Sequence, residues 1–166
     1  MSGLTVTTPP SALPIGEVET RNYLRIDTDV DTNLVTALMT AARDWAENFT
    51  NRTLINTTYT LSLDAIGERD QFLREGMFTG AYQIPYLNYI ELPRSPVASV
   101  THIKSFNDAN TESTLAASNY YSDLVREPAR VVLRDGGSWP TDLRNANGIE
   151  VQYVAGYGSS GADVPE

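Results

Sequence analysis

The side chains that could carry out catalysis are few and do not form a recognisable set. The single histidine, His102, lies in a predicted strand in opposite phase to Ile103, and the chain has no cysteine. The sequence has neither a Gly-x-Ser-x-Gly nucleophile pattern nor a Gly-x-x-x-x-Gly-Lys phosphate loop. Gly156 and Gly158 follow a strand, but no third glycine opens a helix, so a dinucleotide site is not supported. We therefore predict no catalytic residue and no cofactor.

One acidic segment resembles the start of a calcium-binding loop. Its carboxylates alternate through Asp27, Asp29 and Asp31. However, Thr32 stands where the loop needs glycine, and Leu38 stands where it needs a bidentate glutamate. We expect Asp29 or Asp31 to cap a helix and interact with its dipole instead, and we predict no metal site. A loosely held cation is the alternative.

Aromatic residues raise a second possibility, a sugar-binding groove. The chain has nine tyrosines and two tryptophans. Trp45 lies on the predicted apolar face of a helix, and Trp139 precedes Pro140 in a predicted turn. Packing in the core and at a corner explains both tryptophans. A carboxylate pair for glycoside cleavage cannot be picked out from the sequence.

The composition is that of one globular domain with no affinity for membranes or duplex DNA. The 166 residues are 41% apolar and 20% charged. No run approaches the length of a membrane span, and residues 1–14 lack the charge and apolar run of a signal peptide. The net charge of −9 does not suit neutralisation of phosphates. Eleven of the twelve basic residues are arginine, which indicates either subunit contacts or lineage bias.

The N-terminal part should contain an extended arm and two helices. Residues 1–13 predict the arm, and residues 14–24 predict a short helix buried through Val18, Tyr23 and Leu24. A long helix should start after Asp29 or Asp31 and run to about Thr50, with Asn51 as a left-handed stop. Seven apolar residues recur at helical spacing and predict its buried face: Leu34, Val35, Leu38, Ala41, Ala42, Trp45 and Phe49.

The rest of the sequence has the two-residue period that is typical of β-strands. Tyr59, Leu61 and Leu63 alternate with polar residues, and short strands follow between turns rich in glycine, proline and asparagine. These strands are expected at 89–92, 97–106, 120–125, 130–133 and 149–154. The aromatic-rich segment 67–88 predicts a long binding loop. The fold class is therefore α+β: helices within 14–51, then a β-rich part, 53–158, forming a small antiparallel sheet or sandwich.

Several segments in order resemble one protein family. Leu24-Arg25-Ile26-Asp27 closes the short helix, and Phe49-Thr50-Asn51-Arg52 ends the long one. The segments that follow are Ile90 to Val100 (IELPRSPVASV), Tyr120 to Asp123 (YYSD), Gly137 to Pro140 (GSWP), Tyr153 to Gly158 (YVAGYG) and Val164-Pro165. Together they resemble the head–tail connector (adaptor, or head-completion) proteins of tailed phages, over about residues 15–165.

The resemblance implies a structural role in a virion. Such proteins form a homo-oligomeric ring, usually of twelve subunits, beneath the portal protein. The ring continues the DNA channel and presents a docking face to the next neck or tail-completion protein. Members have no active site, and packaged DNA passes without specific binding. The implied location is the neck at the portal vertex, after synthesis in the host bacterial cytoplasm, with no membrane contact.

Two features depart from the family pattern. The loop 67–88 is longer than usual, and members usually continue past Val164-Pro165 with another apolar helix, whereas this chain ends at Glu166. Either a C-terminal segment is absent from this sequence, or this member is truncated. If the helix normally holds the ring or portal contact, one interface of the family is missing here. Asn51 stands where a glycine is common and serves the same left-handed conformation.

The contacts expected for such a ring lie on the long helix, in the loop 67–88 and in the proline-rich N-terminal arm, the last two reaching adjacent subunits. Arg43 and Glu47 should lie on the exposed side of the helix, although each could equally be a solvated surface residue. An acidic lumen would repel DNA and let it slide. The loop candidates are Arg69, Phe72, Arg74, Phe78, Tyr82 and Tyr86.

Two other classes of function stay open. A virion decoration or carbohydrate-binding module would be a monomer with an exposed aromatic groove. An enzyme would need two carboxylates facing each other in a deep pocket. Fold alone does not choose between these classes.

Overall fold

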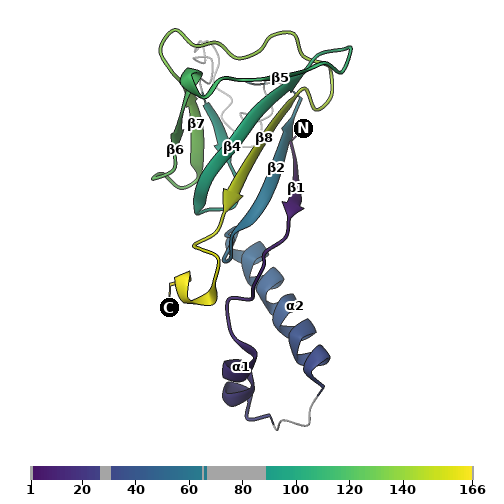
Figure 1. Ribbon diagram of the computed structural model, residues 1–166, viewed down its shortest axis with the longest axis vertical. Coiled ribbons are helices and arrows are strands. Elements are labelled where there is room, and N and C mark those ends of the chain that lie inside the picture. The colour runs from purple at the N-terminus through teal and green to yellow at the C-terminus, as the bar shows by residue number, and fades with distance from the viewer. Residues whose placement is uncertain (1, 27–30, 65, 67–88, 166) are drawn as a thin grey trace, which may run out of the picture.

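The computed structural model describes residues 2–26, 31–64, 66 and 89–165. The strands gather at one end of the molecule, and the two helices project from the other end, as Figure 1 shows. The predicted order of a short helix, a long helix and then antiparallel strands is confirmed. The loop 67–88 lies outside the described residues.

Two antiparallel sheets make up the β part. The larger sheet has the order β1-β2-β8-β4-β5, and the smaller has the order β3-β7-β6. The strands of the larger sheet are β1 (Ser2–Thr8), β2 (Thr57–Leu63), β8 (Ile149–Ala155), β4 (Val97–Phe106) and β5 (Glu112–Thr114). Those of the smaller sheet are β3 (Tyr89–Leu92), β7 (Ala129–Leu133) and β6 (Tyr120–Asp123).

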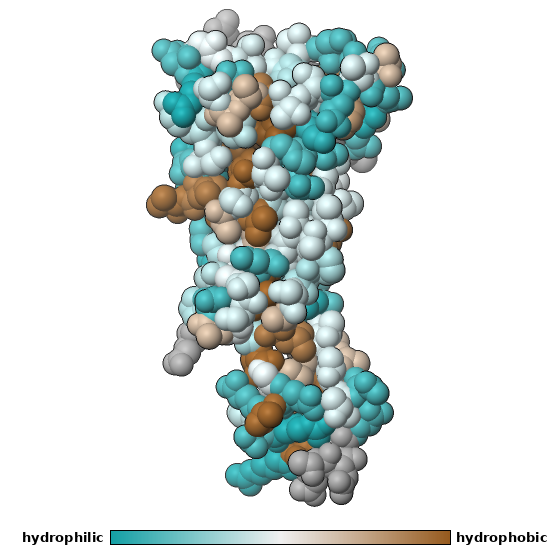
Figure 2. Space-filling view, in the orientation of Figure 1, coloured by the Kyte–Doolittle hydropathy of each residue, from teal (hydrophilic) through white to brown (hydrophobic). Residues whose placement is uncertain are grey.

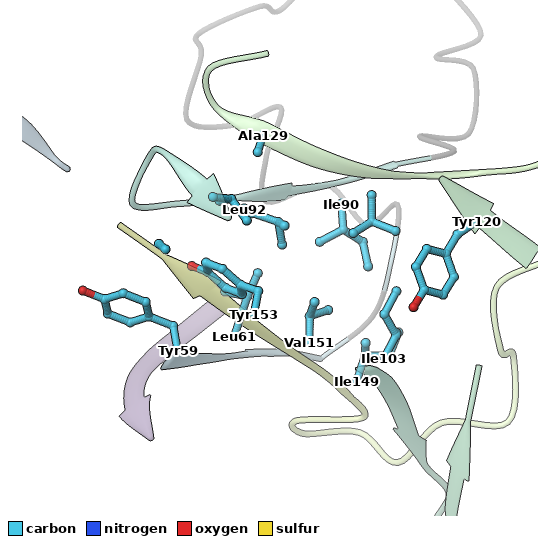
Figure 3. Close-up of a cluster of buried hydrophobic side chains, with 13 residues drawn as sticks. Tyr59, Leu61, Ile90, Leu92, Ile103, Tyr120, Ala129, Ile149, Val151 and Tyr153 are labelled. Carbon is cyan, nitrogen blue, oxygen red and sulfur yellow. The ribbon is translucent and has the colours of Figure 1, made fainter. Parts of the chain in front are cut away.

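The core lies between the two sheets. Alternate residues of each strand point inward, as in β8, where Ile149, Val151 and Tyr153 are at most 1% exposed. From the other sheet, Leu92 and Val131 are fully buried. Figure 3 shows side chains from both sheets meeting in this cluster. The period-two pattern predicted for residues 59–63 therefore marks a real buried face, with Leu63 only partly covered.

Two buried tyrosines of this core, Tyr59 and Tyr153, are both hydrogen-bonded. The Tyr153 hydroxyl donates to the Pro93 carbonyl at 2.8 Å, and the Tyr59 hydroxyl lies 3.0 Å from Thr53 Oγ1. Burial raises the pKa of the Tyr153 phenol well above its ordinary value, so the group stays protonated and keeps donating. The two rings also stack at 5.8 Å between centroids. The hydroxyls of these two tyrosines are therefore paired, whereas the buried Trp139 Nε1 beside the core has no hydrogen-bond partner among the described residues.

Both helix ends predicted for the long helix are confirmed. The helices are α1 (Glu17–Leu24) and α2 (Thr32–Thr50). Asp31 caps α2, because its side chain accepts a hydrogen bond from the Asn33 N–H at 2.8 Å. Asn51 ends it in the left-handed conformation, with φ of 53°. Asp27 and Asp29 lie outside the described residues. Within the described residues, no helix is long and apolar enough to cross a membrane.

The N-terminal arm is a strand rather than a free extension. Residues 2–8 pair antiparallel with β2, so that Leu4 lies opposite Leu61. Leu4 packs against the core, which explains why this uncharged segment joins the sheet. A second unpredicted strand, β5, pairs with the end of β4. Strand β5 is short and polar and carries little periodic signal. In β1, Leu4 and Val6 alternate with threonine, but Val6 stays exposed, so the pairing of both strands depends on the neighbouring strand.

Removing a core side chain should destabilise the protein strongly. Leu92 is fully buried between the sheets, so Leu92→Ala should lower the free energy of unfolding by about 2–5 kcal/mol. The same truncation at Leu38, which is 61% exposed on α2, is the matched control and should leave it nearly unchanged. Urea unfolding followed by circular dichroism measures both values. Equal losses in the two variants would contradict the assigned core.

Candidate assembly surface

The most apolar face of α2 points away from the rest of the chain. Leu34, Leu38, Trp45 and Phe49 are between 54% and 77% exposed, whereas Val35 is the only buried residue of the seven predicted. The prediction that this face is buried is therefore wrong for the chain by itself. Figure 2 shows apolar side chains reaching the surface at the helical end, among hydrophilic ones. A periodic apolar pattern indicates that one face of a helix will be buried. It does not indicate whether the same chain or a partner buries that face.

These residues form one continuous stripe along the helix. At about 100° per residue, Leu34, Leu38, Ala41, Trp45 and Phe49 fall within about 80° of one another. We call this set the α2 apolar stripe. The opposite part of the helix carries the residues that the rest of the chain covers wholly or partly: Val35, Met39, Arg43, Ala46 and Glu47.

Trp45 belongs to this stripe and not to the core, which corrects the prediction for it. The side chain is 68% exposed and stacks on Phe49, with ring centroids 5.2 Å apart and planes 8° from parallel. The two residues are four positions apart, so the helix itself brings their rings together. Trp139, by contrast, packs partly buried against the core, as predicted. The stripe thus displays a flat aromatic pair near the C-terminal end of α2.

Helix α1 buries none of its residues. Val18 is 74% exposed, Tyr23 87% and Leu24 54%, so the prediction that they form a buried side is wrong. Arg21 joins the two helices by donating to Thr32 Oγ1 at 3.0 Å, and it also pairs with Glu17 at 2.8 Å. An eight-residue helix is marginal in water by itself and gains its stability from packing. The helical end therefore carries more apolar surface than its own contacts cover.

Glu47 anchors α2 to the sheets instead of facing a partner. It is 8% exposed, and its Oε1 accepts a hydrogen bond from the Leu54 N–H at 2.7 Å. Arg94 donates to the Glu47 carbonyl at 2.8 Å and to Asn48 Oδ1 at 2.5 Å, which satisfies groups at the helix C-terminus. The prediction that Glu47 is exposed is therefore wrong.

Arg43 is also mostly covered. Its side chain is 14% exposed, and its guanidinium pairs with Asp44 Oδ1 at 2.6 Å. It lies on the same side of the helix as Glu47, one turn earlier. The prediction that Arg43 lies on the exposed side is therefore also wrong.

The segment after α2 is tied into the β part by backbone hydrogen bonds. The Thr53 N–H donates to the Ser95 carbonyl at 3.0 Å, and the Asn56 N–H donates to the Gly158 carbonyl at 2.8 Å. Gly156 is required here: its φ is 137°, and a Cβ would lie 2.5 Å from the Asn56 nitrogen. We call residues 47–56, with the partners just described, the α2 junction.

An arginine completes the α2 junction on its outer side. Arg52 donates to the Tyr157 hydroxyl at 2.8 Å and to both carboxylate oxygens of Glu127, in the turn between β6 and β7. These contacts, led by the hydrogen bond to Glu127, raise the pKa of the Arg52 guanidinium. A planar guanidinium that holds a carboxylate with two donors fixes direction as well as distance. The junction therefore holds the C-terminal end of α2 in one orientation.

The remaining predicted residues divide into two groups. The loop candidates lie outside the described residues, and they are Arg69, Phe72, Arg74, Phe78, Tyr82 and Tyr86. His102 is half-buried with Nε2 3.4 Å from Glu150 Oε1, while Ile103 is buried on the opposite face, as its phase predicted. Among the described residues, no group of three or more histidine, aspartate or glutamate side chains could hold a metal ion.

Solved structures of other proteins contain chains with a similar fold. The chain matches one in "Neck of empty GTA particle computed with C6 symmetry" with a TM-score of 0.71 and 24% identity, covering 98% of this chain and 75% of that one. A second match, in "Virion of native gene transfer agent (GTA) particle", has a TM-score of 0.70 and 22% identity, with the same coverage. A third, in "Neck of native GTA particle computed with C12 symmetry", has a TM-score of 0.69 and 24% identity, covering 99% and 74%.

At these identities, the likeness shows a shared fold over nearly the whole chain. No family model matches the sequence. No curated protein is significantly similar to it. The structural matches therefore stand beside the exposed helical surface as the observations that bear on function.

Removing the Glu47 carboxylate should weaken the α2 junction. Glu47→Ala leaves the part-buried Leu54 N–H without its acceptor, which should cost about 1–3 kcal/mol of unfolding free energy. Glu47→Gln is the matched control, because its amide oxygen can accept the same hydrogen bond, and it should retain most of the stability. Denaturant unfolding of the three proteins measures this order. A glutamine variant as unstable as the alanine variant would contradict the assigned role of the hydrogen bond.

Proposed function

We propose that this protein is a structural subunit of a virion neck. In this proposal, copies form a ring, of twelve subunits as first expected, that joins the portal vertex to the next neck or tail-completion protein and continues the DNA channel. The α2 apolar stripe is the observation that carries the proposal, since an isolated chain has no use for four large exposed apolar side chains on one helix. The role is non-enzymatic, uses no cofactor and involves no membrane.

The structural matches support a ring in particular. Two of them come from necks computed with C6 and C12 symmetry, and they share this fold over nearly the whole chain. A cyclic ring uses heterologous contacts, in which one face of a subunit meets a different face of its neighbour. The α2 apolar stripe is then one of these faces, and its occupant is the adjacent copy of this chain.

Energetics favour the stripe over the charged contacts first expected. Burying one large apolar side chain contributes about 1.5–3 kcal/mol, whereas an exposed ion pair contributes about 0–1 kcal/mol. Leu34, Leu38, Trp45 and Phe49 therefore replace Arg43 and Glu47 as the helical contact residues of the proposal. The six loop candidates in 67–88 remain proposed contacts to neighbouring subunits.

Charge sets the expected behaviour toward DNA. With a net charge of −9, an assembled ring places many negative charges around the channel. Such a lumen repels the phosphate backbone, so DNA slides through without specific binding. A channel lined mainly by arginine in the assembled neck would contradict this part of the proposal.

A carbohydrate-binding or virion decoration module is the second candidate, favoured by one observation. The Trp45–Phe49 pair offers two nearly parallel, exposed rings, and flat aromatic surfaces can pack against sugars. This reading predicts a monomer that binds glycans and loses binding in Trp45→Ala. The continuation of the stripe through Leu34 and Leu38 favours a protein partner instead.

The mass of the protein, alone and mixed with the portal protein of the same virus, tests the proposal. We expect a ring, or a complex that forms only with the portal, by light scattering. A monomer that ignores the portal would contradict the neck assignment, and glycan binding would then be the measurement that tests the second candidate.

A negative charge placed on the stripe should prevent assembly without unfolding the subunit. Leu38→Glu puts a carboxylate at the centre of the apolar face, so we expect at least a tenfold loss of ring or portal complex by light scattering. Thr36→Glu adds the same charge two residues earlier, at an exposed position outside the stripe, and should assemble as wild type. Circular dichroism checks that both variants fold. Normal assembly of Leu38→Glu would remove the stripe from the interface.

A further inference from the structure

Strand β1 leaves one edge of the larger sheet open. Among the described strands it is the outermost of that sheet and pairs only with β2, from Ser2 opposite Leu63 to Thr8 opposite Thr58. Figure 1 shows it along the outside of the sheet. Apart from Leu4, which packs on the core, the side chains of residues 3–8 are exposed. Its outer backbone groups are therefore available to another strand.

This edge lacks the charges that protect the other edges. Among the described strands, the outermost ones besides β1 each contain a carboxylate: Glu91 in β3, Glu112 in β5 and Asp123 in β6. In contrast, β1 contains none, and residues 2–16 have no charged side chain. Charges on edge strands are a common means of preventing unwanted pairing. The edge of β1 is thus the one described edge without this protection.

The charge of the chain suggests what covers this edge. Copies with a net charge of −9 repel each other over most of their surface, so an uncharged strand is where two copies can approach at low cost. The opposite edge of the same sheet, β5, is compatible with such a contact. Its Glu112 pairs with Lys104 at 2.9 Å, which offsets the negative charge of that edge.

Strand directions make β1 and β5 suitable for a ring. Four successive antiparallel pairings lead from β1 to β5, so these two outer strands run in the same direction. A rotation about an axis along the strands preserves that direction from one copy to the next. Joining β1 of one copy to β5 of another is therefore heterologous and can repeat around a ring. Pairing of β1 with itself would instead give a closed, two-fold dimer.

We propose that the free edge of β1 pairs, in parallel, with the β5 edge of a second copy of this chain. The inference rests on the proposed ring and adds a second contact to the α2 apolar stripe. Backbone hydrogen bonds supply the affinity of such strand addition, and the uncharged side chains permit the approach. The sheets of neighbouring subunits then join edge to edge.

Cross-linking between introduced cysteines tests the pairing directly. The chain has no cysteine, so the introduced thiols are the only reactive ones. Thr5→Cys lies in β1 and Ser113→Cys lies in β5, and both positions are exposed. A short bismaleimide tolerates a shift of one or two residues in the register of the two strands. The controls are each single variant and Thr5→Cys combined with Ser138→Cys, an exposed position outside the strands. Circular dichroism confirms that each variant folds.

The expected result is a ladder of covalent species at multiples of 18.2 kDa from the Thr5→Cys/Ser113→Cys protein and none from the controls. Dimers from Thr5→Cys alone would show that β1 pairs with itself and would overturn the inference. A ring by light scattering without a ladder would overturn it and leave the proposed function intact. A monomer without a ladder, with or without portal protein, would overturn both. A ladder from a protein that ignores the portal would keep the strand pairing and contradict the neck assignment.

Discussion

Helix α2 leaves the β part of the molecule through a junction held by hydrogen bonds, several of them part-buried, and the orientation of the helical end depends on it. The Glu47 carboxylate holds the Leu54 N–H, and Arg94 holds the Glu47 carbonyl at the end of the helix. The chain then continues beside residues 95 and 158 through backbone bonds. Because a partly buried polar group is costly to leave unpaired, these contacts allow one orientation of the helix. Because this junction is fixed, α2 keeps its exposed apolar face in one orientation although the helix packs little against the rest of the described chain.

The two ends of the molecule consequently differ in how much of their apolar surface is buried. The sheets enclose a core of buried apolar side chains, in which the Tyr59 and Tyr153 hydroxyls are hydrogen-bonded. The helical end has the opposite balance, since α1 buries no residue and α2 turns its most apolar face to water. In the proposed ring, such a subunit would fold through its sheets and bury the exposed face of its helices against a neighbour. The uncharged edge of β1 is similar, because it too is a surface without a partner among the described residues.

Local physics made part of the fold predictable. Asp31 and Asn51 bound the long helix because capping and the left-handed conformation depend on a few neighbouring atoms. The alternation of Tyr59 and Leu61 with threonine follows from the two faces of a strand, so that strand was also predictable. Strand β1 was not predicted, although Leu4 and Val6 alternate with threonine there, because an extended arm becomes a strand only when another strand, here β2, lies beside it.

The sequence by itself determined which residues are apolar together, and only the tertiary structure decided which of those groups are enclosed. The spacing of Leu34, Leu38, Trp45 and Phe49 indicates one face of a helix, yet the same spacing serves a core or an interface. Glu47 shows the reverse: a carboxylate in a helix suggests a solvated residue, but the Leu54 N–H, seven residues away, makes it a buried anchor. Such contacts depend on where distant or folded-back segments come to lie. That information resides in the packing of the sheets and not in the local period of the chain.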